Sequence, residues 1–265
     1  MILYISTIFV ALITIWLLRL VNINAKTKNF YENKAPVVII GGTSGIGKST
    51  VEILKKGGKS VLVTGRNESA LSELQNSGNG LITTLKGDVN DSSFIEDLTE
   101  HINELETKPM SYVISAGYGL DLPFSELTHD AIAQYLNTNL TSLTILCRAI
   151  LEIDPNAHIL LISSVQAFIH RKNKSLYCIA KAGLLTLGDC LISEGYNVTV
   201  FCPSWVKTNF RSNTLTTSKK DSQGMSSEKC AGYLVQSLCL RPHRIIRSRI
   251  FALVCLCFSV KSVLF

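Results

Sequence analysis

Short apolar, β-branched runs alternate with segments of helical pattern through the middle of the chain. Val37 to Ile40 and Val61 to Thr64 are such runs, and helix-like segments follow them at Lys48 to Lys56 and Ser69 to Asn76. Repetition of strand and helix predicts parallel strands joined by helical crossovers. The alternation continues with apolar runs at 81–85, 112–115, 158–163 and 198–201. We therefore predict an α/β fold, with a doubly wound parallel sheet in a single domain over residues 35–240.

The amino-terminal end has a different pattern. Met1 to Leu18 holds no charged side chain, and as a helix it would be about 27 Å long, near the thickness of a bilayer core. It has no basic start and no small-x-small site before Lys26, which favours an uncleaved anchor over residues 1–21 rather than a cleaved signal peptide. No basic residue precedes this segment, whereas four follow it, which places the domain in the cytosol: Arg19, Lys26, Lys28 and Lys34.

The carboxyl-terminal end is basic and then apolar. Five basic residues run into the stretch Ile250 to Val260, which is too short to span a bilayer easily: Arg241, His243, Arg244, Arg247 and Arg249. This pattern indicates a tail over residues 241–265 that contacts anionic lipid headgroups. Nucleic acid is not expected as a partner, because no binding motif or interleaved aromatic residue accompanies the cluster. The sequence leaves the oligomeric state open, and a homo-oligomer is allowed.

Composition agrees with one packed domain in a reducing compartment. The chain has 265 residues, of which 46% are apolar and 17% charged, as expected of a globular protein. Its eight cysteines show neither disulfide nor metal-ligand spacing, so we expect reduced thiols and no metal.

A glycine-rich turn follows the first apolar run, and its letters allow two interpretations. Gly42 to Ser49 satisfies the P-loop pattern G-x-x-x-x-G-K-S. A P-loop NTPase also needs a metal-binding aspartate at the end of an apolar strand, and the only candidate, Asp88, matches that requirement poorly. A dinucleotide site predicts a ribose-selecting residue at the end of the second strand. Gly65-Arg66 stands there. It offers no carboxylate to bind the free 2′-hydroxyl of NAD, but its guanidinium can bind the 2′-phosphate of NADP. The pattern therefore favours a Rossmann-like sheet that binds NADPH/NADP+.

Tyr177 and Lys181 are the main candidates for chemistry. Their spacing of four places both side chains on one face of a helix, where the ammonium can lower the pKa of the phenol toward neutrality. Such a phenol is a general acid for a carbonyl oxygen. Ser164, at the end of another predicted strand, can hydrogen-bond the same oxygen.

From Pro36 to about Thr208 the chain resembles the short-chain dehydrogenase/reductase family. The matching motifs are Gly41-x-x-x-Gly45-Ile46-Gly47, Gly87-Asp88-Val89, Ser115-Ala116-Gly117, the Ser/Tyr/Lys set and Pro203-Ser204-Trp205-Val206-Lys207-Thr208. The resemblance implies a catalytic tetrad in which Asn139 holds a relay water, Ser164 orients the substrate, Tyr177 transfers the proton and Lys181 also binds the nicotinamide ribose. It implies cofactor contacts at Gly41, Thr43, Ser44, Gly45, Ile46, Gly47, Arg66, Asn67, Asp88, Val89, Ser115, Ala116, Gly117, Tyr177, Lys181, Pro203, Val206 and Thr208.

The apolar ends and the cofactor turn favour a lipid substrate. Within the family, Arg66-Asn67-Glu68 and the two apolar ends resemble reductases of 3-ketosphinganine, which lie on the cytosolic face of the endoplasmic reticulum. We therefore expect a membrane-bound reductase of a long-chain lipid ketone, with 3-ketosphinganine as the first candidate. Steroid or retinoid reduction is the nearest alternative. Ile40, Ser115 and Ser204 depart from the family pattern, which leaves a non-catalytic scaffold open, and the P-loop NTPase is the third alternative.

Overall fold

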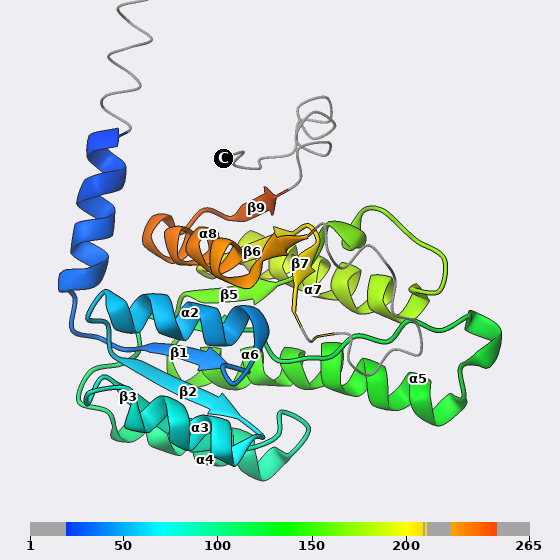
Figure 1. Ribbon diagram of the computed structural model, residues 1–265, viewed down its shortest axis with the longest axis horizontal. Helices are drawn as coiled ribbons and strands as arrows, with labels where there is room; N and C mark the ends of the chain where they lie inside the picture. The colour runs from blue at the N-terminus through cyan, green and yellow to red at the C-terminus, as the bar shows by residue number, and fades with distance from the viewer. Residues whose placement is uncertain (1–19, 209, 211–223, 248–265) are drawn as a thin grey trace, which may run out of the picture.

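A seven-stranded sheet forms the centre of the protein (Figure 1). The computed structural model describes residues 20–208, 210 and 224–247. The order of the sheet is β3-β2-β1-β4-β5-β6-β9, and every neighbouring pair is parallel. The strands are β1 Val37–Ile40, β2 Val61–Gly65, β3 Ile82–Lys86, β4 Ser111–Ile114, β5 Ile159–Ile162, β6 Val198–Pro203 and β9 Arg244–Arg247, with a separate short pair of β7 Val206–Lys207 and β8 Met225–Ser226.

Helical crossovers join these strands, as the alternation of apolar runs predicts. The order of strands reverses between β1 and β4, which is the doubly wound arrangement. The helices are α2 Gly45–Lys56, α3 Glu68–Asn76, α4 Ser92–Glu104, α5 His129–Leu136, α6 Ser142–Ile153, α7 Ser175–Ser193 and α8 Ser227–Leu240, with the short turns η1 Phe124–Glu126, η2 Asn137–Thr141 and η3 Val165–Ala167.

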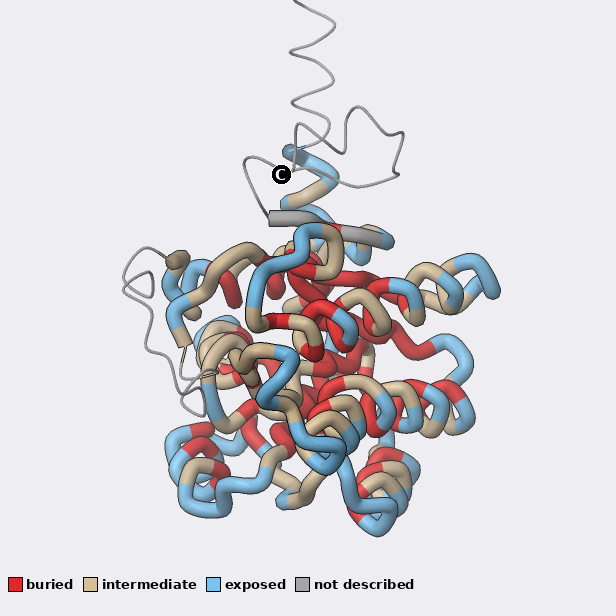
Figure 2. Tube along the Cα trace, turned by 90° about the vertical axis from the view of Figure 1, so that its right-hand side faces the viewer, coloured by how far each residue is buried: buried red, intermediate tan, exposed pale blue. Residues whose placement is uncertain are grey.

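Alternate residues of the strands pack into two hydrophobic cores, one on each face of the sheet. Val38 and Ile40 of β1 pack with α4, α6 and α7, whereas Val37 and Ile39 pack with α2, α3 and α8. All four are fully buried, and Figure 2 shows the buried positions gathered along the sheet and the inner sides of the helices. Because helices cover both faces of the sheet, the sequences of these strands are continuous apolar runs rather than alternating apolar and polar residues. The prediction of a Rossmann-like parallel sheet is confirmed.

The domain extends beyond its predicted end at residue 240. Residues 244–247 form β9, which pairs with β6, and Ile245 is buried in the core below α8. The sheet therefore takes in part of the segment that the charge pattern assigned to a tail over 241–265. A pair of isoleucines flanked by arginines fits an edge strand as well as it fits a basic collar, since charged residues are common on edges.

A helix over residues 20–32 precedes β1, and its carboxyl-terminal end is fastened to the domain by Lys59. The Lys59 ammonium donates to the carbonyl of Phe30 at 3.0 Å and to that of Asn33, and it lies 5.1 Å from the centre of the Phe30 ring. Tyr31 packs where a side chain on Gly57 would otherwise stand. These contacts lie at the amino ends of the strands, opposite the edge where the strands finish (Figure 1).

One helix of the described part, α7, is long and apolar enough by length and composition to cross a membrane. It packs on β5 and β6, and its buried residues include Leu184 and Gly188, so it is a core helix of the domain. The predicted anchor over residues 1–21 lies outside the described residues except for 20–21, and the predicted tail lies outside them after residue 247.

Candidate active site

A cleft of about 740 Å³ opens at the carboxyl ends of the strands. This edge of an open parallel sheet is where such folds bind ligands. The segments that follow β1, β2, β3, β4, β5 and β6 all contribute to its lining, and α7 adds Tyr177 and Lys181. Of the predicted site residues it brings together Gly41, Thr43, Ser44, Gly45, Ile46, Arg66, Asp88, Val89, Ser115, Ala116, Gly117, Ser164, Tyr177, Lys181, Pro203, Val206 and Thr208.

The glycine turn after β1 leaves room that only glycines permit. Gly41 has φ +84°, and a Cβ there would lie 2.6 Å from the backbone nitrogen of Ala116. A Cβ on Gly47 would lie 2.2 Å from the carbonyl oxygen of Gly41. Gly47 is buried at the start of α2 and does not line the cleft, so it acts through close packing of the turn. The turn delivers the amino end of α2, which has no acidic residue in its first turn, to the cleft, and such an end attracts phosphate.

Arg66 stands at the end of β2, where the ribose-selecting residue was predicted. Its guanidinium is 3.3 Å from the carboxylate of Asp88, which follows β3, and its side chain is 69% exposed. An exposed pair of this kind is weak, so the guanidinium is available to a 2′-phosphate. Gly65 is required beside it, because a Cβ there would lie 2.6 Å from the methyl group of Thr43. These residues fit NADPH better than NADH.

Asn67 has a structural role that the resemblance did not reveal. Its side-chain oxygen accepts from the backbone nitrogen of Ala70 at 3.0 Å and from the hydroxyl of Ser69 at 2.8 Å. It is therefore the amino-terminal cap of α3. Asn67 does not line the cleft, so a direct cofactor contact stays a prediction.

Asn139 is buried behind the cleft rather than in its wall. It lies in the π-helical stretch between α5 and α6. Its side-chain oxygen accepts from the backbone nitrogen of Tyr118 at 3.0 Å, and its amide donates to the carbonyl of Tyr135 at 3.0 Å. Asn139 thus joins the loop after β4 to the end of α5, the helix that leads directly into its own stretch, and its role with a relay water stays a prediction.

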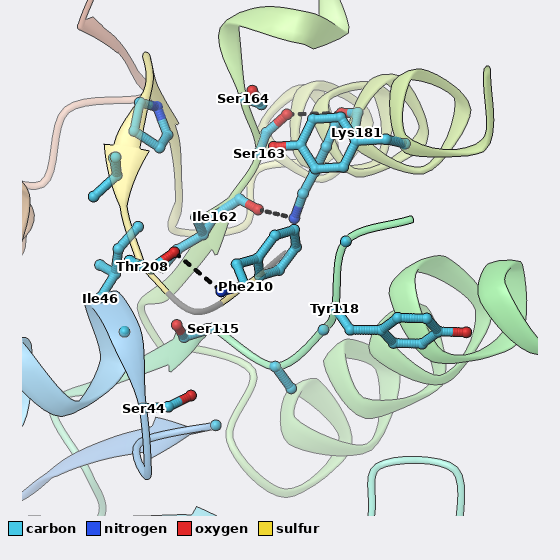
Figure 3. A pocket seen from close by; sticks show the side chains of 18 of the residues that line it. Ser44, Ile46, Ser115, Tyr118, Ile162, Ser163, Ser164, Lys181, Thr208 and Phe210 are labelled. Carbon is cyan, nitrogen blue, oxygen red and sulfur yellow. Dashed lines mark hydrogen bonds between the residues drawn. The ribbon is translucent and has the colours of Figure 1, made fainter. Parts of the chain in front are cut away.

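The catalytic candidates meet where β5 ends against α7. The Lys181 ammonium donates to the carbonyl of Ile162 at 2.9 Å (Figure 3). It lies 6.0 Å from the centre of the Tyr177 ring. The Ser163 hydroxyl donates to the carbonyl of Lys181 at 2.7 Å, which fixes the helix against the strand. The oxygen of Ser164 accepts from the backbone nitrogen of Gln166 at 3.1 Å, so its proton can still be donated to a ligand.

Burial shapes the charge of Lys181. The side chain is buried, and desolvation lowers the pKa of its ammonium to about 8. The Ile162 carbonyl and the Tyr177 ring are the groups that hold the cation in place. A cation fixed beside a phenol favours the ionised form of that phenol, which is the arrangement that proton transfer to a carbonyl requires.

The P-loop interpretation is wrong in this geometry. Lys48 would have to reach the terminal phosphates, but its ammonium lies 3.6 Å from the carboxylate of Glu73 on α3. Neither Lys48 nor Ser49 lines the cleft. The match to G-x-x-x-x-G-K-S therefore does not indicate a P-loop.

The cleft also contains residues that are not among the predicted site residues. The Tyr177 and Phe210 rings meet edge to face with centres 6.1 Å apart. Lys174 and Asp121 form an ion pair in the lining. The additional lining residues are Tyr118, Asp121, Gln166, Ile169, Arg171, Lys174, Trp205 and Phe210.

Comparison with known proteins gives the same class of protein. A family model for short chain dehydrogenases matches residues 35–219. An uncharacterised oxidoreductase of Staphylococcus saprophyticus is 29% identical over 188 residues, 67% of this chain and 80% of the relative. The 3-oxoacyl-acyl-carrier-protein reductase of Chlamydia pneumoniae is 26% identical over 186 residues, 66% of this chain and 75% of the relative. A short-chain dehydrogenase from Sphingobium yanoikuyae, solved in complex with NADPH, has a TM-score of 0.71 at 20% identity and covers 85% of this chain and 96% of its own.

The fold and the cleft define an oxidoreductase that binds a dinucleotide at the switch point of a parallel sheet. The chain belongs to the short chain dehydrogenase family, because the family model spans most of its length. The predicted enzyme class, an NADP-dependent oxidoreductase, is confirmed by this membership, and the cofactor in the Sphingobium structure is the one that Arg66 predicts.

Proposed function

We propose that the protein is a membrane-bound, NADPH-dependent reductase of a long-chain lipid ketone, with 3-ketosphinganine as the first candidate and sphinganine as its product. The observation that carries the carbonyl chemistry is the placement of Tyr177, Lys181 and Ser164 in one cleft. The apolar ends of the chain support a bilayer-borne substrate. We place the enzyme in the endoplasmic reticulum membrane, with its domain in the cytosol.

The residues of the cleft divide the work of the reduction. NADPH supplies the hydride when it is bound. The amino end of α2 and Arg66 hold its phosphates. Ser164 donates to the carbonyl oxygen of the substrate, and Tyr177 gives that oxygen its proton. Lys181 stabilises the phenolate that is left behind, and Ile162 holds Lys181 in place.

The outer side of the cleft supports an aliphatic ketone. Ile169, Trp205 and Phe210 line it, and Ile169 is 43% exposed, as expected for the rim of a site that receives an apolar chain. The segment His170-Arg171-Lys172-Asn173-Lys174 is basic, and positive charge near the cleft would disfavour a substrate that carries an ammonium group. The pairing of Lys174 with Asp121 reduces this positive charge.

The test is NADPH oxidation by the detergent-solubilised full-length protein. 3-Ketosphinganine, an 11-ketosteroid and retinal are offered separately at equal concentration. The proposal expects turnover with 3-ketosphinganine and its loss in Ser164→Ala. Lys55→Met, on α2 and outside the cleft, serves as the matched control and should retain full rate. Turnover of the steroid or retinal alone would assign the enzyme to another substrate class.

A further inference from the structure

An ion pair lies beside the reacting tyrosine. Lys174 and Asp121 contact each other through their side chains, which are 10% and 13% exposed. The Lys174 ammonium lies 5.7 Å from the centre of the Tyr177 ring, close to the 6.0 Å of Lys181. Both members of the pair line the cleft. Tyr177 therefore has two lysine cations at comparable range.

Lys174 does not stabilise the helix that it begins. Lys174 is the amino-terminal cap of α7 and makes no side-chain capping bond. A cation at this end is unfavourable, because it opposes the helix dipole. Asn67, Thr128 and Ser226 occupy the same position in α3, α5 and α8, where each accepts a backbone hydrogen bond. Helix stability therefore does not explain a lysine here.

Among the described residues, the groups near Tyr177 come from α7 and the segment before it, the loop after β4, α5 and Phe210. Lys181 and Lys174 belong to α7 and its cap, and Asp121 belongs to the loop after β4. Tyr135, from α5, is buried and its pKa is raised first by desolvation and then by Tyr177 itself, so it stays neutral. Other neighbours are the half-buried Tyr118 and the buried thiol of Cys178, and Arg171 lies on the exposed segment before Lys174. Among the described residues, the ammonium groups of Lys174 and Lys181 lie 5.7 Å and 6.0 Å from the centre of the Tyr177 ring, and the Asp121 carboxylate pairs with Lys174.

We propose that Lys174 acts together with Lys181 as a second cation on Tyr177, and that Asp121 is the counter-ion that limits its effect. Lys174 is a positioning residue in this proposal, because it acts through the tyrosine. The proposal rests on the proposed function, in which Tyr177 is the proton donor. It explains why a lysine stands at a helix start where a capping side chain would be more stable.

The two members of the pair have opposite expected effects on the phenol. Lys174→Met leaves the Asp121 carboxylate without its partner, which disfavours the phenolate. Asp121→Asn removes the carboxylate that pairs with Lys174, which favours the phenolate. Charges at this range move an ionisation midpoint by about one pH unit, or roughly tenfold in the phenolate fraction at a given pH. A pair with only a structural role would loosen the loop in both variants and would not produce opposite shifts.

The experiment is a titration of phenolate absorbance in the full-length protein loaded with NADP+. Subtracting the titration of Tyr177→Phe in the same background isolates the signal of Tyr177. We expect a higher midpoint in Lys174→Met, a lower one in Asp121→Asn, and a near-normal one in Lys174→Arg and in the double variant. Lys55→Met is the matched control, because Lys55 pairs with Glu52 at 2.7 Å on α2, outside the cleft, and its midpoint should not move.

Shifts in the same direction, or no shift in either variant, would overturn the proposal. If Lys174→Met does not fold, the comparison of Asp121→Asn with Lys174→Gln carries the same opposite signs. The titration reads the tyrosine itself and needs no ketone substrate. Full turnover by Tyr177→Phe would defeat the proposed function, whereas the sign of the two shifts decides the role of Lys174 separately.

Discussion

Acidification should destabilise the domain through His158, a residue far from the catalytic groups. His158 precedes β5, and its ring nitrogens lie 2.9 Å from the hydroxyl of Ser111 on β4 and 2.9 Å from that of Thr199 on β6. The ring thus joins three strands at their amino ends. Burial, and then the nearby Arg241, lower the pKa of His158 from 6.5 to about 3, so the folded state holds the ring neutral.

The sign and size of the effect follow from this lowered pKa. Below pH 6.5 the unfolded chain binds a proton that the folded chain does not, so stability falls as pH falls from 6.5 toward 3. Between pH 7.5 and 4.5 this single residue removes about 2.7 kcal/mol of unfolding free energy, at about 1.4 kcal/mol for each tenfold change in proton affinity. With an m-value of about 3 kcal/mol per M, the urea midpoint falls by about 0.9 M.

Urea unfolding at several pH values checks this number. His158→Gln keeps an amide that can bond to both hydroxyls but does not titrate, so its midpoint should fall by about 0.9 M less than that of the wild type over this range. His129→Gln, at the exposed start of α5, is the control and should follow the wild type. Equal pH dependence in the wild type and His158→Gln would refute the reasoning, because the remaining loss would then belong to carboxylates alone.

Three further predictions concern the cofactor site and the amino-terminal helix. Arg66→Ala should weaken NADPH binding by about 1.5 to 3 kcal/mol, roughly tenfold to a hundredfold, and leave NADH binding unchanged; titration calorimetry measures this, and equal wild-type affinity for both cofactors would contradict it. The value of kcat/KM for NADPH, which reports on the free enzyme, should fall as pH rises above about 8, because Lys181 then loses its proton. A flat profile up to pH 10 would show that the Lys181 ammonium is not needed for catalysis. Lys59→Met removes the donor to the carbonyls of Phe30 and Asn33 and should speed hydrogen exchange over residues 20–32, at a cost of about 1 to 3 kcal/mol; unchanged exchange would show that other contacts hold the helix.

Local patterns indicate the parts of the site that depend on neighbouring residues. The spacing of Tyr177 and Lys181 needs only helical periodicity, and the glycine turn needs only backbone sterics. Tyr177, Lys181, Gly41 and Gly45 all line the cleft. The buried strands were also predicted correctly, because helices cover both faces of the sheet and the apolar runs are therefore unbroken.

The features that sequence reasoning missed depend on contacts between distant segments. Asp121 and Lys174 meet across more than fifty positions, and no local pattern marks either residue as part of the cleft. Asn67 and Asn139 have polar side chains that suit a ligand, but backbone groups nearby take up their hydrogen bonds. β9 was assigned to the tail because its arginines dominate the pattern, whereas its pairing with β6 is a tertiary contact.

The most direct test of the central claim is a single-turnover measurement of NADPH oxidation with excess 3-ketosphinganine, in the wild type and in Tyr177→Phe. Both proteins should bind NADPH with similar affinity, because the phenol acts on the substrate. We predict that the wild type converts one equivalent of NADPH and produces sphinganine, whereas Tyr177→Phe loses most of the rate, by a hundredfold or more on the order expected for general acid catalysis. Oxidation at a similar rate in both proteins, or none in a wild type that binds NADPH, would contradict the account.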